Sequence, residues 1–155
     1  MTLPWEYVKD RASLKLRCED LLRELCYKAE SVFSVPIAVM PQVVITTARK
    51  YYARILQEKA AIPIIRVNEL FVRFYKADPI LADYALKFAL AHEVAHIVQR
   101  KIYGIGGMLL SHPLAVEEEA NKFAERISEI EFEDFKDACY ELHKKIGLVE
   151  EMLHL

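Results

Sequence analysis

Residues 92–96 read HEVAH, a pattern in which two histidines lie one helical turn apart and a glutamate follows the first. On a helix, His92 and His96 project from the same side, at the spacing that a single metal ion requires. Glu93 lies beside them, where a carboxylate can take a proton from water and return it to a leaving group. These residue types at this spacing predict a catalytic zinc site.

The segment around HEVAH carries the signals of a long, buried helix. Asp78 followed by Pro79 is typical of a helix start, because aspartate accepts hydrogen bonds from free N–H groups and proline lacks an N–H in the first turn. Gly104 ends the pattern after Tyr103. Apolar residues cover most of the helix between these points, so its polar side chains need a metal ion or hydrogen-bond partners. The alternative interpretation is a pair of hydrogen-bonded core histidines.

A third ligand is expected, because catalytic zinc takes three protein atoms and keeps a fourth position for water. A second helix is predicted after Pro113, and on it Glu117 and Asn121 share one face. Small alanines near that face allow a close approach to the HEVAH helix, so Glu117 can reach the metal. Asn121 then lies where its side-chain oxygen can accept the free ring N–H of a histidine ligand. His112 remains the alternative third ligand, and Glu118 and Glu119 are expected to be solvated.

These motifs resemble those of gluzincin metallopeptidases, in which HExxH is followed by ExxxD on a later helix. The resemblance implies that His92, His96 and Glu117 bind zinc and that Glu93 is the general base. Asn121 stands where that family has an aspartate, so it keeps the acceptor but lacks the charge, and we expect weaker metal binding or lower activity than is usual for the family.

Further stretches extend the resemblance over residues 43–126. EEEANKFA is similar to the downstream motif of ImmA/IrrE-type and HtpX-type peptidases. IPIIRVNELF, followed later by ALAHEVAH, resembles the strand and active-site helix of minigluzincins and SprT-like proteases. SprT-like enzymes use a third histidine, a role that His112 would fill. Minigluzincins are latent, so the resemblance also implies that a C-terminal tail carrying His154 blocks the metal site. A frayed terminus whose histidine has no role is the commoner explanation of such a tail.

Peptide-bond hydrolysis is the reaction expected of such a site. Water bound to zinc loses a proton readily, Glu93 accepts that proton, and the carbonyl polarised by zinc is attacked. The residue that stabilises the oxyanion is left open among Tyr103, Tyr140 and His143, which are candidates by chemistry alone.

The chain of 155 residues predicts one α+β domain in which helices dominate. Helices are expected over residues 4–34, over the HEVAH and Glu117 segments, and over 131–155, with a break near Gly147. Strands are expected at 43–45, 51–57 and 62–67, the second and third joined by a turn at 58–61, although 51–57 could be helical. The resemblance implies that residues 1–155 form a minimal zincin-like metallopeptidase domain, with an N-terminal helix at 1–34, a catalytic core at 43–126 and a C-terminal helical segment at 131–155. Segment 62–67 is the candidate edge strand for extended substrate, or else an ordinary core strand.

The composition and the N-terminal residues indicate the cellular location of the protein and the state of its cysteines. The N-terminus lacks the basic start and apolar core of a signal peptide, so a cytoplasmic protein is expected. Residues 31–48 carry no charge, but their prolines and polar residues argue against a membrane span. Few Asn, Gln and Gly beside 28% charged residues are typical of thermophile proteins. Three cysteines without a CxxC pair, at positions 18, 26 and 139, are expected to be buried thiols.

Three functions follow from these patterns. The first is a small intracellular zinc peptidase acting on peptides or proteins. The second is a regulatory or DNA-associated protease, suggested by residues 43–76, where seven Lys or Arg stand against two Glu. A solvated basic face is the commoner explanation of that surplus. The third is a module that holds zinc for structure alone, which would need no general base at position 93. The oligomeric state stays open.

Overall fold

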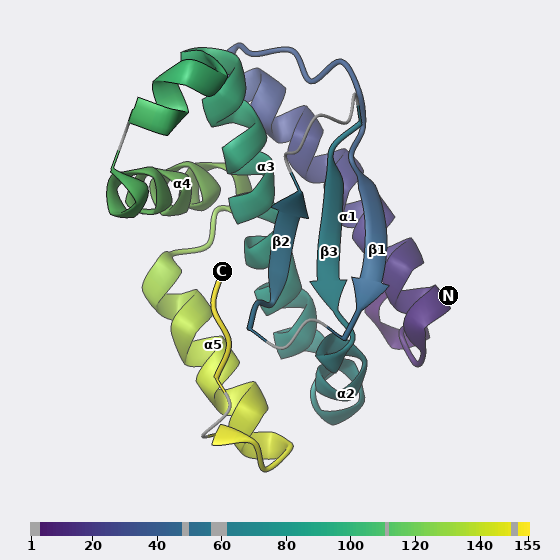
Figure 1. Cartoon of the computed structure of the whole chain (residues 1–155). Helices are drawn as coiled ribbons and strands as arrows, with labels where there is room; N and C mark the ends of the chain where they lie inside the picture. The colour runs from purple at the N-terminus through teal and green to yellow at the C-terminus, as the bar shows by residue number, and fades with distance from the viewer. Residues whose placement is uncertain (1–3, 48–49, 57–61, 111, 150–151) are drawn as a thin grey trace.

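The computed structural model describes residues 4–47, 50–56, 62–110, 112–149 and 152–155, with the side chains of 4–5 and 105–110 left out. Helices dominate an α+β fold with a small three-stranded mixed sheet, as expected (Figure 1). Its elements are η1 (Pro4–Tyr7), α1 (Arg11–Phe33), β1 (Gln42–Thr46), β2 (Ala53–Leu56), β3 (Ile64–Asn68), α2 (Leu70–Ala77), α3 (Pro79–Leu110), α4 (Pro113–Ser128) and α5 (Phe132–Lys145).

The N-terminal helix begins later than the expected helix over residues 4–34. A capping box defines its start: the Asp10 carboxylate accepts the Ser13 N–H at 2.8 Å, and the Ser13 hydroxyl accepts the Asp10 N–H at 3.1 Å. Both bonds use N–H groups that would bond within the helix if it continued through Asp10, so they mark a helix end. Helix α1 therefore begins at Arg11, and Pro4–Tyr7 forms a separate 3-10 turn.

The sheet has the order β1-β3-β2, with β1 parallel and β2 antiparallel to β3. All three expected strands are present, and segment 51–57 is a strand, not a helix, over Ala53–Leu56. The edge-strand prediction for 62–67 is wrong, because β3 lies between its two neighbours and Ile65 and Val67 are fully buried. The edge strand beside α3 is β2 (Figure 1). The turn expected at 58–61 lies outside the described residues.

The HEVAH helix α3 starts where expected, with the Asp78 carboxylate accepting the N–H of Leu81 at 3.1 Å. Gly104 interrupts its helical geometry with φ 72° and ψ 168°, and a further helical segment continues to Leu110. Most of the helix before the break is buried, and α1, α2, α4, α5 and β2 all pack on it. The short helix α2 was not expected. Its buried side chains, Phe71, Phe74 and Tyr75, help to fill the core.

A part-buried polar network fixes α3 against α1 and α2. The Arg17 guanidinium on α1 donates two hydrogen bonds of 2.8 Å to the Asp83 carboxylate on α3. Tyr75 on α2 donates a third, at 2.6 Å. Because every charge in this network is paired, it holds three helices in register without leaving a buried group unsatisfied.

The C-terminal segment is helical only in part, which corrects the expected helix over 131–155. Helix α5 ends at Lys145, and Gly147 takes the left-handed φ of 76° that turns the chain back. The end of the chain then lies alongside residues 50–52. Tyr52 donates its N–H to the His154 carbonyl at 2.8 Å, and His154 donates its own to the Lys50 carbonyl at 2.8 Å. We refer to the described residues 152–155 as the tail.

None of the described helices combines the length and the apolar character needed to cross a bilayer. The cysteines at positions 18, 26 and 139 are buried free thiols, as expected.

Candidate metal centre

Three candidate ligand side chains from two helices meet at one point. His92 and His96 project from α3, and Glu117 projects from α4. His92 Nε2 lies 2.9 Å from Glu117 Oε2, His96 Nε2 lies 3.3 Å from Glu117 Oε1, and the two Nε2 atoms are 3.1 Å apart. One ligand atom from each residue lies within 4.8 Å of the others, so the three side chains can hold one metal ion.

The acidic and basic groups at this point shift each other's pKa values. Burial alone would raise the pKa of Glu117, but hydrogen bonds with His92 and His96 outweigh it and lower the pKa to about 2. Burial would lower the pKa of His96, but its hydrogen bond with Glu117 and the charges of Glu93 and Glu117 raise it. The His92 and His96 rings are buried, whereas 48% of the Glu117 side chain is exposed, so the group opens to solvent on the Glu117 side.

Asn121 fixes the orientation of His92, as expected. One turn after Glu117 on α4, its Oδ1 accepts the Nδ1–H of His92 at 2.8 Å. With Nδ1 donating to Asn121, Nε2 is the ring nitrogen that lies next to Glu117 and would be available to a metal ion.

Gln99 is the hydrogen-bond partner of His96, and the sequence motifs did not predict it. The Oε1 of Gln99 accepts the Nδ1–H of His96 at 2.8 Å, and its amide nitrogen donates to Glu119 Oε1 at 3.1 Å. Tyr103 also donates to Glu119, at 2.7 Å. Glu119 is therefore a hydrogen-bond acceptor at the α3–α4 contact, which corrects the expectation that it is simply solvated. The spacing of three residues, which places Gln99 next to His96 on one face of a helix, was the one feature of the sequence that could have predicted this contact.

Glu93 occupies a buried position between α3 and the sheet. Its Oε2 accepts the N–H of Ile55 on β2 at 2.7 Å. Burial raises the pKa of Glu93, although His92, His96 and the Ile55 N–H each act to lower it. The Asn68 N–H of β3 donates to the Tyr52 carbonyl. Because main-chain groups alternate between the two sides of a strand, the N–H of Ile55 on β2 points away from β3. The outer edge of β2 therefore touches the expected general base.

His112 caps α4 and is not part of the metal-ligand group. Its Nδ1 accepts the N–H of Leu114 at 3.2 Å, and the residue is exposed. Of the two alternatives for the third ligand, the geometry favours Glu117, whose carboxylate is the one grouped with both histidines.

A cavity of about 330 Å³ lies over the candidate metal centre. His92, Glu117 and Asn121 line one part of it, while Tyr52 and the tail, including His154, line another. Backbone hydrogen bonds hold His154 there, and the residue is exposed. The tail thus lines the same cavity as His92 and Glu117.

The three candidates for oxyanion stabilisation do not line this cavity. Tyr103 donates to Glu119, and Tyr140 lies 48% exposed on α5. His143 is fully buried, donates its Nδ1–H to the Leu148 carbonyl and accepts the Tyr52 hydroxyl at 2.9 Å. Tyr52, which the sequence did not single out, is the tyrosine that lines the cavity.

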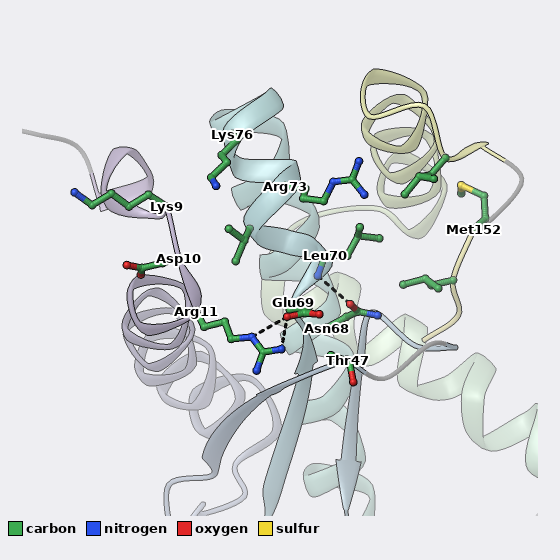
Figure 2. A pocket seen from close by; sticks show the side chains of 13 residues that line it. Lys9, Asp10, Arg11, Thr47, Asn68, Glu69, Leu70, Arg73, Lys76 and Met152 are labelled. Carbon is green, nitrogen blue, oxygen red and sulfur yellow. Dashed lines mark hydrogen bonds and ion pairs between the residues drawn. The ribbon is translucent and has the colours of Figure 1, made fainter.

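A second, larger cavity of about 990 Å³ lies near the start of α1 and α2, on the other side of the tail (Figure 2). Basic side chains from both helices line it, and Arg11 is paired with Glu69 there. Met152 and Leu153 line both cavities, so the tail forms a wall between this basic cavity and the metal centre.

No protein-family model, curated protein or solved structure matches this chain. The case for a function therefore depends on the residues and geometry of the candidate metal centre.

Proposed function

We propose that this protein is a small zinc-dependent peptidase. The observation that carries the proposal is the grouping of His92, His96 and Glu117, with one ligand atom from each within 4.8 Å of the others. Two imidazole nitrogens and one carboxylate oxygen form the donor set typical of catalytic zinc, and the solvent-exposed side of Glu117 leaves room for water. Zinc is preferred because neutral imidazoles with a carboxylate suit it well.

Glu93 supplies the proton chemistry in this proposal. A bound dication would make a water molecule more acidic and would polarise a substrate carbonyl. Glu93 takes the proton of the attacking water and later passes it to the leaving amine. Its raised pKa, caused by burial, favours the first step, because a more basic carboxylate accepts a proton more readily, and the Ile55 N–H keeps one of its oxygens oriented. A site that held zinc for structure alone would have no use for such a buried carboxylate.

Substrate binding is proposed along the outer edge of β2. That edge faces α3, and an extended peptide can pair with an exposed strand edge through its main chain. The tail already uses the same end of this edge, because His154 exchanges backbone hydrogen bonds with Lys50 and Tyr52. We therefore include latency in the proposal: the tail, with His154, covers the cavity until it is displaced.

A regulatory peptidase that acts on a single partner protein is the second candidate. The covering tail favours it, since an enzyme blocked at rest needs an activating event. The two candidates differ on generic substrates: activity on casein-like proteins after tail removal favours the first, and cleavage of one partner only favours the second.

Metal analysis of four purified proteins, and peptide hydrolysis by the same four proteins without residues 152–155, test the proposal. The wild type should bind about one zinc ion per chain. Glu93→Gln should keep the metal and lose turnover, whereas Glu117→Ala should bind zinc more weakly. Glu118→Ala, which alters the exposed neighbour of the ligand, is the matched control and should behave as the wild type. Undiminished hydrolysis by Glu93→Gln, or a wild type that binds no zinc, would refute the proposal.

A further inference from the structure

A buried amide connects the second histidine of the HEVAH motif to α4. Gln99 lies one helical turn after His96 on α3 and is 1% exposed. Its Oε1 accepts the His96 Nδ1–H at 2.8 Å, so the contact is a buried hydrogen bond of normal length.

The environment of Gln99 permits only one orientation of its amide. The amide nitrogen donates to the Val116 carbonyl at 2.9 Å and to Glu119 Oε1 at 3.1 Å. Both partners are acceptors, so a flipped amide would direct its oxygen against two oxygens and lose both bonds. Glu119 is itself held by the hydroxyl of Tyr103 at 2.7 Å. The oxygen of Gln99 can therefore face only His96.

A fixed acceptor next to Nδ1 determines which ring nitrogen faces the metal centre. In a zinc-bound His96 the ring proton would lie on Nδ1, held by Gln99, and Nε2, which lies beside Glu117 and His92, would be the ligand atom. We propose that Gln99, held by Val116 and Glu119, is a positioning residue that fixes the tautomer and ring orientation of His96 for metal binding. The inference rests on the metal centre of the proposed function, but not on hydrolysis.

The same helix thus prepares both histidines. Asn121 of α4 fixes His92 directly, and α4 fixes His96 through Gln99, while Glu117 of α4 supplies the third ligand. Both orienting groups are neutral amides that accept a histidine proton. A metal ion at this centre consequently depends on the α3–α4 contact for its three ligands and for both ring orientations.

Gln99→Met separates positioning from packing, because methionine has a similar length and shape but lacks the strong acceptor. Zinc affinity is measured on the full chain by competition with a chromogenic chelator, and urea unfolding of the metal-free proteins is measured in parallel. We expect Gln99→Met to bind zinc about 10- to 100-fold more weakly than the wild type. Glu118→Gln is the control and should leave the affinity unchanged.

A double variant tests the direction of the hydrogen bonds. In Gln99→Glu the carboxylate faces Glu119 and loses its two donor contacts, so affinity should fall. Adding Glu119→Gln supplies an amide that can donate to the new carboxylate, and affinity should recover toward the wild-type value. A purely structural role for Gln99 predicts no such rescue in zinc affinity at equal unfolding stability.

Proton NMR of the zinc-loaded protein gives a readout independent of hydrolysis. The wild type should show a slowly exchanging Nδ1–H of His96, protected by its hydrogen bond to Gln99, and Gln99→Met should lose that protection. Wild-type zinc affinity in Gln99→Met, or an equally protected Nδ1–H in that variant, would overturn the inference. Tight zinc binding without any hydrolysis by the protein that lacks residues 152–155 would overturn the proposed peptidase and leave the inference standing.

Discussion

Zinc should stabilise the folded protein, and Glu117 should be required for the effect. The three ligand atoms come from α3 and α4 and meet only in the folded chain, so zinc binds the native state in preference to the unfolded one. At a free zinc concentration about 100-fold above Kd, the gain is about 2.7 kcal/mol. For a chain of this size each kcal/mol raises Tm by about 2–4 °C, so the expected increase is about 5–11 °C.

The zinc-induced increase in Tm should become larger as the pH rises. Zinc requires neutral imidazoles, and the pKa of His96 is raised by Glu117 and Glu93 in spite of burial, so the metal-free site retains a proton above the usual range of histidine. Zinc must displace that proton. The zinc-induced shift should therefore grow as the pH rises through and beyond the ordinary pKa of 6.5.

Differential scanning fluorimetry with zinc in excess over a chelator buffer measures the effect. Glu117→Ala should lose most of the shift, Glu93→Gln should keep it, and Glu118→Ala should match the wild type. Magnesium should give no comparable shift, because it prefers oxygen ligands in an octahedral arrangement. The reasoning is refuted if zinc leaves Tm unchanged, or if Glu117→Ala shifts as much as the wild type.

Three other outcomes are expected. Burial raises the folded pKa of Glu93 above 4.5, so ionisation of this carboxyl lowers the free energy of unfolding as the pH rises from 4.5 through the folded pKa. Metal-free Glu93→Gln should therefore be more stable than the wild type at neutral pH, as measured by urea unfolding. If the extra stability of the variant does not shrink toward pH 4, the expectation is wrong. Asp83→Ala removes the carboxylate partner of the part-buried Arg17 guanidinium and should cost about 1–3 kcal/mol by urea unfolding, against less than about 1 kcal/mol for Glu133→Ala at an exposed ion pair. Equal costs would contradict the network. Deleting residues 152–155 should increase peptide cleavage, because the tail lines the cavity and occupies the end of the β2 edge; a folded, zinc-loaded truncation with unchanged or lower activity would exclude latency.

Features set by short-range spacing followed from the sequence. The Asp78–Pro79 helix start and the one-turn spacing of His92 and His96 depend on the geometry of a single helix. The pairing of Glu117 with Asn121 on one face of the next helix is of the same kind. Each involves residues within about one turn, where 3.6-residue periodicity decides which side chains lie together.

The tertiary structure decided the rest. Segment 62–67 looks like any buried strand, and only its pairing with both β1 and β2 makes β3 central and turns the β2 edge toward α3. Glu119 looks like a solvated charge until the packing of α4 on α3 brings it to Gln99. The tail likewise reaches residues 50–52 across about a hundred positions. Such contacts depend on which long loops close in the folded chain, and the free energy that selects them comes from burial summed over the whole core, which no local pattern encodes.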